Sequence, residues 1–494
     1  MNHSRDLPRP RYPLYSAPDN RANREESTTI EQYQIVIIGS GPGGYTAGIR
    51  AAMRGAKVAV VEDRDLGGVC LNRGCIPSKA LIASAAQYKH MKESEDFGIH
   101  LTTPPVYNWL AMRGRKDKIV NQLVTGIGQL FKSHGVKHYQ GFGKIDDPNH
   151  VSVYSADGKV TRIKTEDIII ATGSRPINLP AFPIDGYHIL TSDHLLELDH
   201  LPKSMLIIGA GVIGCEWAFM LSLLDVEVHM VELLEHALPM EDENTSKLIE
   251  RELKKLKVKL HTKTKVEAIE PGSEGILAKL SGGKTIEANQ ALVSIGRAFN
   301  TEDIGLDEVG VERNKNGSIK TGDDMKTNVD NIYAIGDVRG DILLAFTAVH
   351  DGAVAVDNCL GEGSAKNYLG VPSVIFTHPE VASVGLTEKV ARDKYDVEIG
   401  KFPLRALGKA HAENEIAGEV KVIGDKKTDK LLGVHIVGIH ATEIIHVAAL
   451  AINQGLTVKQ LGDLIFGHPV ISESIMEAAH DLHGISVHLA KKRR

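Results

Sequence analysis

Two of the four cysteines lie five positions apart, in the segment Cys70-Leu71-Asn72-Arg73-Gly74-Cys75. Pro77 and an Ala- and Leu-rich stretch follow, which predicts a helix whose first turn lies at Cys75. Unpaired amides and the helix dipole stabilise a thiolate there, so we expect Cys75 to ionise readily and Cys70 to reach it as a disulfide partner across the intervening turn. This favours a redox-active disulfide over zinc, which lacks a further ligand pair nearby, and over two buried structural thiols.

A glycine pattern adjacent to the cysteines could bind a dinucleotide. Residues 34–62 contain a β-branched run, a glycine turn, an Ala-rich amphipathic stretch and a second β-branched run, which is typical of a βαβ unit. The turn has the form G-x-G-x-x-G, whose glycines allow a tight turn, close approach to a pyrophosphate and helix packing: Gly39, Gly41 and Gly44. Glu62 ends the second strand, where its carboxylate can accept hydrogen bonds from a ribose.

The same pattern recurs in residues 205–232, with Gly209, Gly211, Gly214 and Glu232 at matching spacings. Two copies with their acidic residues predict two bound dinucleotides, rather than two turns that need glycine only for packing. Glu232 would repel a ribose 2′-phosphate, so the second unit is expected to prefer NAD to NADP. Since a flavin can relay electrons between a dithiol and a nicotinamide, we expect FAD in the first unit.

A histidine near the C-terminus could act as a base. His468 and Pro469 precede a helix-like stretch, and Ser472 marks its start, so His468 is expected on a loop with Glu473 able to fold back on it. A dithiol must lose a proton before it attacks a disulfide, and a carboxylate-oriented imidazole suits that task. A bystander histidine, and a helix-terminal charge for Glu473, are the alternative interpretations.

The composition is that of a globular protein. The 494 residues are 42% hydrophobic and 24% charged with a net charge of −6, which gives nucleic acid no positive field to bind. No apolar run is long enough to span a membrane. Four cysteines are too few for a disulfide-stapled secreted scaffold, so we expect a reducing, cytoplasmic location. Residues 1–30 are rich in Pro, Arg, Asn and Ser and predict a disordered arm, while their acidic residues argue against a transit peptide.

These motifs resemble a known family. The sequence resembles the class I pyridine nucleotide-disulfide oxidoreductases, and within them the dihydrolipoyl dehydrogenases. The resemblance lies in the segment GGVCLNRGCIPSKAL, in both βαβ units and in four further segments, residues 171–174, 295–297, 333–337 and 376–388. The resemblance covers residues 33 to 485. It implies oxidation of protein-bound dihydrolipoyl groups with NAD⁺, and as partners the lipoyl domains and dihydrolipoyl acyltransferase core of 2-oxo-acid dehydrogenase complexes.

The resemblance also implies roles for individual residues. Cys75 would face the flavin, Cys70 would meet the substrate, and Lys79, paired with Glu216, would lie near flavin N5. His468 and Glu473 would come from a partner subunit, so an obligatory homodimer is expected. Further FAD contacts are expected at Gly143, Thr172, Gly173, Ser174, Asp337, Leu343, Leu344, Ala345 and Phe346. The NAD site is expected to include Val266 and Gly296 together with Gly209, Gly211, Gly214, Glu216 and Glu232. No metal site is expected.

The order of the motifs predicts an α/β protein with two Rossmann-like domains and a C-terminal α+β dimerisation domain. After the arm, the predicted parts are 31–176 (FAD-binding), 177–298 (NAD-binding, inserted), 299–368 (FAD-binding, second part) and 369–494 (dimerisation). Phe346 and Arg73 depart from the family pattern. Glutathione reductase-like and mercuric reductase-like activities are the alternatives, the first disfavoured by Glu232 and the second by a C-terminus without cysteines; a docking or scaffold subunit is a third.

Overall fold

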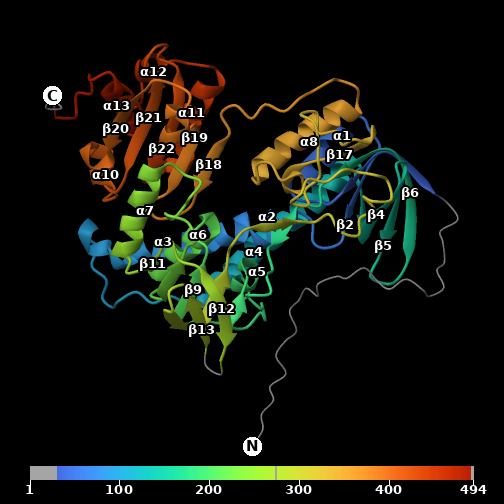
Figure 1. The fold of residues 1–494 in the computed structure, drawn as a ribbon, viewed down its shortest axis with the longest axis horizontal. Coiled ribbons are helices and arrows are strands. Elements are labelled where there is room, and N and C mark those ends of the chain that lie inside the picture. The colour runs from blue at the N-terminus through green and yellow to red at the C-terminus, as the bar shows by residue number, and fades with distance from the viewer. Residues whose placement is uncertain (1–29, 273–274, 491–494) are drawn as a thin grey trace, which may run out of the picture. The chain divides into compact units, whose positions relative to one another are not determined.

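The computed structural model describes residues 30–272 and 275–490, so the predicted N-terminal arm lies outside the described residues except for Ile30. The chain divides into two compact units (Figure 1). The first contains the residues up to Pro77, together with Asp117–Ile177 and Gly296–Lys366. The second contains Ser78–Lys116 and Asn178–Ile295, and continues from Asn367 to the C-terminal end. Each unit is therefore assembled from segments that are distant in the sequence.

The first unit is built on a seven-stranded sheet in the order β3-β2-β1-β6-β5-β4, with β17 also paired to β6. The strands are β1 (Glu31–Ile38), β2 (Val58–Glu62), β3 (Lys137–Gln140), β4 (Phe142–Asp147), β5 (His150–Tyr154), β6 (Val160–Ile170) and β17 (Ile332–Ala334). The pairs β3-β2, β2-β1, β1-β6 and β17-β6 are parallel, whereas β4, β5 and β6 form an antiparallel meander. A short two-stranded ribbon of β7 (Ser174–Pro176) and β16 (Arg297–Phe299) belongs to the same unit.

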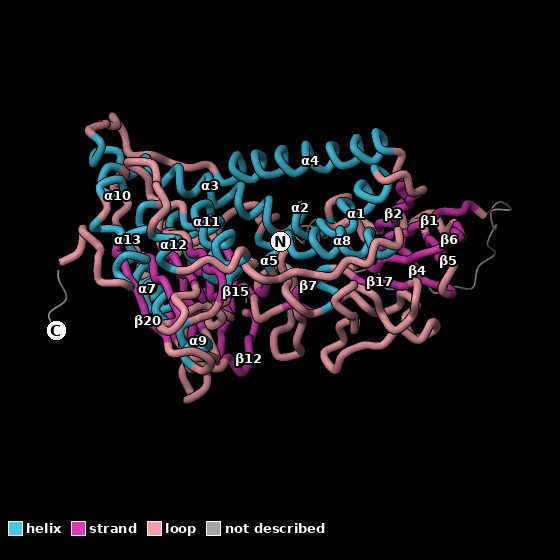
Figure 2. Tube along the Cα trace, turned by 90° about the horizontal axis from the view of Figure 1, so that it is seen from above, coloured by secondary structure: helices cyan, strands magenta, loops and turns pink. Residues whose placement is uncertain are grey.

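The central strands of this sheet are buried on both faces. Residues 35–38 of β1 and all five residues of β2 are buried, which is typical of parallel strands covered by helices. Helices α1 (Pro42–Met53) and α8 (Ala345–Cys359) lie side by side, as Figure 2 shows, and both contribute to one core with residues of these strands. The carboxyl ends of the parallel strands therefore lie at the edge where ligands bind in such sheets.

The second unit contains a parallel sheet in the order β11-β10-β9-β15-β8. Its elements are β8 (Ile189–Leu190), α5 (Ser192–Leu195), β9 (Ser204–Ile208), α6 (Val212–Leu223), β10 (Glu227–Val231), α7 (Glu243–Lys255), β11 (Lys259–His261) and β15 (Gln290–Val293). An antiparallel meander contains β12 (Val266–Pro271), β13 (Ile276–Leu280) and β14 (Thr285–Ala288). The unit thus repeats the strand-turn-helix-strand pattern of the first one.

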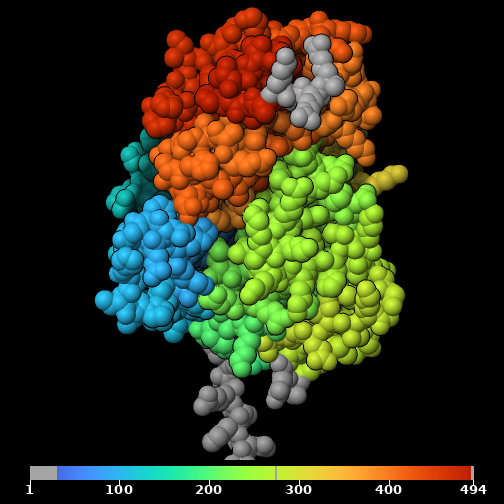
Figure 3. Space-filling view, turned by 90° about the vertical axis from the view of Figure 1, so that its left-hand side faces the viewer, coloured from blue at the N-terminus to red at the C-terminus, as the bar shows by residue number. Residues whose placement is uncertain are grey.

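The C-terminal part of the second unit is an antiparallel sheet in the order β18-β19-β22-β21-β20. The strands are β18 (Pro372–Ile375), β19 (Val381–Gly385), β20 (Val397–Pro403), β21 (Glu419–Asp425) and β22 (Leu431–Val437). Helices α11 (Ala441–Asn453), α12 (Val458–Gly462) and α13 (Glu473–Leu482) share a hydrophobic core with it. Figure 3 shows the orange residues of this part against the green residues of segment 178–295. This sheet positions the loop that carries His468.

The remaining elements are short or connect the sheets. They are α2 (Gly68–Arg73), α3 (Cys75–Lys92), η1 (Ser94–Phe97), α4 (Trp109–His134), η2 (Gly336–Arg339), α9 (Glu388–Arg392), η3 (Leu404–Ala406) and α10 (Gly408–Ala412). Over the described ranges, no helix is both long enough and apolar enough to cross a membrane.

Candidate functional site

The glycine turn between β1 and α1 has the geometry that the sequence predicts. Gly39 has a φ of +104°, and a Cβ there would lie 2.3 Å from the carbonyl oxygen of Ala171. A Cβ at Gly44 would lie 2.0 Å from the oxygen of Gly39, so helix and turn pack without room for a side chain. A Cβ at Gly41, by contrast, would meet no atom within 4 Å. The space in front of Gly41, at the start of α1, is thus open to a phosphate group.

Glu62 lies at the end of β2 with both carboxylate oxygens engaged by the backbone. Oε2 accepts hydrogen bonds from the amide and the hydroxyl of Ser40, at 2.9 and 2.7 Å. Oε1 accepts one from the amide of Arg64 at 3.0 Å. Burial, together with a hydrogen bond and the charge of neighbouring Asp63, raises the pKa of Glu62 to about 7, although the bonds from Ser40 oppose this. Ser40 cannot be recognised from the sequence, because no motif requires a hydroxyl at this position.

The second turn repeats this arrangement. A Cβ at Gly209 would lie 2.4 Å from the oxygen of Ser294, and one at Gly214 would lie 2.0 Å from the oxygen of Gly209. Gly211 faces open space, as Gly41 does. Glu232 accepts hydrogen bonds from the amides of Ala210, at 2.7 Å, and Leu234, at 2.8 Å. Each unit therefore holds a carboxylate beside a glycine turn and a helix N-terminus.

The two cysteines lie on consecutive helices. Cys75 is the first residue of α3, as predicted, so it lies at the positive end of the helix dipole. The expectation of a simple turn between the cysteines is wrong, because α2 (Gly68–Arg73) is helical and includes Cys70. A helix this short, with glycine at both ends, has no periodicity that a sequence could reveal. A Cβ at Gly74 would lie 3.3 Å from the Cα of Cys70, so the absence of a side chain lets the chain return close to Cys70.

Lys79 and Glu216 form an ion pair in the second unit. The Nζ of Lys79 donates to both carboxylate oxygens of Glu216, at 2.9 and 2.8 Å. Glu216 is 5% exposed and also accepts a hydrogen bond from the amide of Phe376 at 3.0 Å. The Nζ of Lys79 lies 4.6 Å from the centre of the Phe376 ring. The segment around Phe376 thus fixes the pair that the sequence comparison with the family had suggested.

A hydrogen-bond network surrounds Asp337 in the first unit. The hydroxyl of Ser174 donates to Oδ2 of Asp337, and Nε of Arg297 donates to that hydroxyl at 2.6 Å. Asp351, which is 1% exposed, accepts from the amide of Gly336 at 3.0 Å and so holds the turn that carries Asp337. Arg297 belongs to a segment that the sequence analysis quoted, but it was not predicted as a site residue. Its partner Ser174 is 123 positions away, which no local pattern reveals.

The other predicted FAD contacts lie on loops or element ends of the first unit. A Cβ at Gly143 would lie 3.0 Å from the Ile38 side chain, so β4 packs closely on the sheet there. The hydroxyl of Thr172 donates to the carbonyl oxygen of Asn300 at 2.7 Å, and a Cβ at Gly173 would face open space. Helix α8 begins at Ala345 and includes Phe346, whereas Leu343 and Leu344 precede it.

Two predicted NAD contacts lie in different units. Val266, at the start of β12 in the second unit, is 5% exposed. Gly296 belongs to the first unit, where its carbonyl oxygen accepts a hydrogen bond from the amide of Ile177 at 3.1 Å. Both residues stay predictions as NAD contacts, because the division into units does not test which residues touch the cofactor.

His468 and Glu473 are hydrogen bonded to each other. Nδ1 of His468 lies 2.9 Å from Oε1 of Glu473, and the amide of Val470 donates to Oε2 at 3.0 Å. Burial disfavours the charge on Glu473, but the bonds from His468 and Val470 hold its pKa below the usual value. The His468 side chain is 81% exposed, so Nε2 is available to a reactant. Glu473 starts α13, as the sequence predicts.

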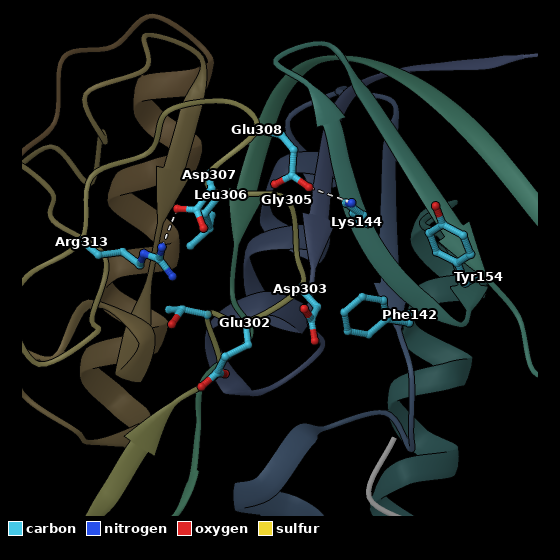
Figure 4. Close-up of a pocket in the computed structure, with 11 residues that line it drawn as sticks. Phe142, Lys144, Tyr154, Glu302, Asp303, Gly305, Leu306, Asp307, Glu308 and Arg313 are labelled. Carbon is cyan, nitrogen blue, oxygen red and sulfur yellow. Dashed lines mark hydrogen bonds and ion pairs between the residues drawn. The ribbon is translucent and has the colours of Figure 1, made fainter. Parts of the chain in front are cut away.

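A cavity of about 490 Å³ in the first unit contains none of the predicted site residues. It lies between β4, β5 and the segment 301–313, as Figure 4 shows. Its charged side chains are paired in part with each other: Lys144 with Glu308 at 2.8 Å and Arg313 with Asp307 at 2.5 Å. Within residues 30–272 and 275–490, no three or more His, Cys, Asp or Glu side chains are grouped so that they could hold a metal ion.

Comparison with known proteins identifies the family. The family described as pyridine nucleotide-disulphide oxidoreductase matches residues 33–352, and its dimerisation domain matches residues 371–479. The chain belongs to the pyridine nucleotide-disulphide oxidoreductases. Among its relatives are a dihydrolipoyl dehydrogenase of Bacillus subtilis, 41% identical over 92% of this chain and 99% of the relative, and a mitochondrial one of Arabidopsis thaliana, 40% identical over 94% and 93%.

Solved structures agree with this assignment. LpdA of Mycobacterium tuberculosis matches with a TM-score of 0.86 at 29% identity, over 92% of this chain and all of that one. The HOCl-induced flavoprotein disulfide reductase RclA of Escherichia coli, in its Cu(II) complex, matches with a TM-score of 0.83 at 28% identity, over 91% and 99%. The predicted α/β fold with two dinucleotide-binding units and a dimerisation domain is therefore confirmed.

The two glycine turns suit the cofactors of this family, FAD and NAD. In each turn the first and third glycines are closed against backbone, whereas the middle one, Gly41 or Gly211, faces open space. The carboxylates of Glu62 and Glu232 are fixed at the strand ends where a ribose would lie. Membership of this family shows that the chain uses FAD and NAD, and the geometry of the two turns fits both cofactors.

Proposed function

We propose that the chain oxidises protein-bound dihydrolipoyl groups to lipoyl groups with NAD⁺ as the acceptor. The observation that carries this proposal is the similarity, at about 40% identity over more than nine tenths of the chain, to proteins named dihydrolipoyl dehydrogenase. The residues that such chemistry needs are present: the Cys70 and Cys75 pair, the His468–Glu473 pair and two dinucleotide turns.

His468 takes the first proton. Glu473 is ionised and accepts a hydrogen bond from Nδ1–H, which leaves Nε2 as the basic nitrogen. Nε2 removes a proton from one dihydrolipoyl thiol, and the resulting thiolate attacks Sγ of Cys70 in the Cys70–Cys75 disulfide. A mixed disulfide forms, and Cys75 leaves as a thiolate at the N-terminus of α3, where the helix amides stabilise its charge.

The second dihydrolipoyl sulfur completes the exchange. This second thiol attacks the substrate sulfur of the mixed disulfide and passes its proton to the departing sulfur of Cys70, so the lipoyl disulfide closes, Cys70 is released as a thiol and His468 keeps the first proton. The substrate has then lost two electrons and two protons, and the cysteine pair holds both electrons. FAD supplies the path by which the electron pair reaches NAD⁺ as hydride. Lys79, held by Glu216, is the positive charge that we assign beside the flavin.

The active form is proposed to be a homodimer in which the partner subunit supplies His468. The chain contains the dimerisation domain of its family, and the His468 side chain is largely exposed within one subunit. Lipoyl domains and the dihydrolipoyl acyltransferase core of 2-oxo-acid dehydrogenase complexes are the proposed partners, and the cytoplasm is the proposed location. The predicted domain limits of 177–298 and 369–494 are kept as part of this proposal.

The test is NADH formation by the purified holoenzyme from dihydrolipoamide and NAD⁺. Parallel reactions contain NADP⁺ in place of NAD⁺, or NADPH with oxidised glutathione. We expect turnover with NAD⁺ at least about a hundredfold faster than with NADP⁺, because Glu232 repels a 2′-phosphate. Faster reduction of glutathione disulfide by NADPH would replace this proposal with a glutathione reductase activity.

A further inference from the structure

Ser40 occupies the variable position between the first two glycines of the first dinucleotide turn, and it is completely buried. Its amide and its hydroxyl both donate to Oε2 of Glu62, at 2.9 and 2.7 Å. Its carbonyl oxygen accepts a hydrogen bond from the amide of Gly67 at 3.0 Å, and the same amide lies 3.3 Å from the hydroxyl oxygen. One buried residue therefore contacts both the carboxylate of Glu62 and the segment before Cys70.

The segment on the other side of Ser40 is the start of the helix that carries Cys70. Gly67 is the N-cap residue of α2, with a φ of +94°. A Cβ at Gly68 would lie 2.6 Å from the Cα of Gly41, so α2 begins directly against the dinucleotide turn. The side-chain amide of Asn72 donates to the carbonyl oxygens of Leu66 and Gly68, both at 2.9 Å. These two hydrogen bonds tie α2 to the residues at which it begins. Gly67 and α2 are thus held together by close packing and by hydrogen bonds.

The second dinucleotide turn supplies an internal comparison. Ala210 takes the place of Ser40, and its amide donates to Glu232 as that of Ser40 does to Glu62. The carbonyl oxygen of Ala210 accepts from the amide of Leu238, at 2.8 Å. The backbone contacts are therefore common to both turns, and the hydroxyl is what the first turn adds. Glu62 is followed by Cys70 and Cys75, whereas no cysteine follows Glu232 at a corresponding distance. The serine hydroxyl therefore occurs in the turn that lies next to the redox-active segment.

We propose that Ser40 is a positioning residue that joins the ribose-binding carboxylate of Glu62 to the helix carrying Cys70. The hydroxyl donates to the carboxylate of Glu62 on one side, and on the other its oxygen contacts the amide of Gly67, at the start of α2. FAD binding and the placement of Cys70 are thereby coupled through one side chain. This inference deepens the proposed function, since it takes the first unit as the FAD site, but it does not depend on the identity of the disulfide substrate.

The coupling predicts a pH dependence of FAD binding. The groups that face Glu62 are Ser40, the backbone amide of Arg64 and the carboxyl of Asp63. Ribose hydroxyls donate to the ionised carboxylate, so FAD binding lowers the pKa of Glu62 from its raised value, and binding weakens as the pH falls through about 7. Loss of the Ser40 hydroxyl removes one bond to the charged form and moves this weakening upward by about one pH unit.

The experiment compares Ser40→Ala and Ser40→Gly with the wild-type holoenzyme. FAD retention after gel filtration is measured from pH 5.5 to 8.5 by flavin absorbance, and amide hydrogen exchange is measured in α2 and α6. We expect both variants to lose half of their FAD about one pH unit above wild type and to exchange α2 amides about threefold to tenfold faster, with α6 unchanged. Either variant suffices if the other fails to fold.

The control is Ala210→Ser, which adds a hydroxyl to the second turn and should leave FAD retention and α2 exchange as in wild type. Retention and exchange like wild type in both Ser40 variants would overturn the proposal. A shift in retention without faster α2 exchange would overturn the joining role, because Ser40 would then act on Glu62 alone. FAD retention and amide exchange are measured without dihydrolipoyl turnover. They therefore test the role of Ser40 even if dihydrolipoyl groups prove not to be the substrate.

Discussion

The His468–Glu473 pair gives the sharpest prediction about catalysis. In Glu473→Gln the side chain keeps its shape, but its amide can donate to Nδ1 of His468, which the carboxylate never does. Donation to Nδ1 favours the tautomer whose proton is on Nε2, and that nitrogen is then no longer basic. The variant therefore keeps the histidine in place and removes its function as a base.

The expected magnitudes differ between catalysis and stability. A positioned general base contributes about 10²- to 10⁴-fold, so we expect kcat/KM for dihydrolipoamide to fall about 10²-fold in Glu473→Gln and somewhat more in His468→Ala. The His468 side chain is 81% exposed, so water replaces most of the pair, and the free energy of unfolding should change by less than about 1 kcal/mol.

Two assays on the same preparations separate the role of the base from general damage. NADH formation from dihydrolipoamide requires the thiol proton to be removed, whereas oxidation of NADH by ferricyanide does not involve the dithiol. The second rate should stay within about twofold of wild type, because His468 acts only on thiols. An equal loss in both assays would refute the role of His468, and wild-type dihydrolipoamide turnover in Glu473→Gln would refute that of Glu473.

A matched control lies one helical turn further along α13. Glu477 is 1% exposed, and its Oε1 lies 2.8 Å from Nδ1 of His488. Glu477→Gln thus removes a carboxylate from a second His–Glu pair, whose glutamate lies on the same helix. We expect its dihydrolipoamide turnover to remain within about threefold of wild type, because its partner is not the base.

Three further predictions follow from the site and its surroundings. Cys75→Ser should retain FAD but abolish dihydrolipoamide oxidation, measured by flavin absorbance and NADH formation, and appreciable turnover would contradict the disulfide scheme. Gly211→Val should raise the KM for NAD⁺ at least about tenfold with an unchanged melting temperature, because its side chain would enter the open space where we propose that the cofactor binds; an unchanged KM would contradict this. Glu415 is half-buried beside His378 and Lys89: burial opposes its ionisation, but these partners lower its pKa from 4.5 to about 2. The ionised carboxylate therefore stabilises the fold above pH 4.5, and this stabilisation is lost as the pH falls towards 2. In urea unfolding, the difference in free energy of unfolding between wild type and Glu415→Gln should shrink by up to about 3 kcal/mol from pH 6 to pH 2.5. A difference that does not change with pH would contradict this.

The sequence predicts those parts of the site that depend on local patterns. Gly39 and Gly209 can be recognised because the turn leaves no room for a Cβ, and the glycines that mark the turn all lie within six consecutive residues. The start of α3 at Cys75 and of α13 at Glu473 is likewise expressed by nearby Pro and Ser. Motif order adds the arrangement of the dinucleotide-binding units.

The remaining parts depend on contacts between distant segments. Helix α2 is six residues long and is held by Ser40 and Asn72 rather than by its own periodicity. Arg297 acts through Ser174, and Glu216 is fixed by the amide of Phe376, 160 positions away. Such pairs leave no periodic trace in a single sequence, so only the folded chain reveals them.

The redox role of the Cys70 and Cys75 pair is the central claim, and differential alkylation measures it most directly. The oxidised holoenzyme is treated anaerobically with one equivalent of dihydrolipoamide, labelled with iodoacetamide under native conditions, and mapped by mass spectrometry. We predict label at Cys70 and Cys75 only after reduction, with Cys215 unlabelled throughout because burial raises the pKa of its thiol. Equal labelling of Cys70 and Cys75 before and after dihydrolipoamide, in a preparation that forms NADH from dihydrolipoamide and NAD⁺ in a separate assay, would contradict it.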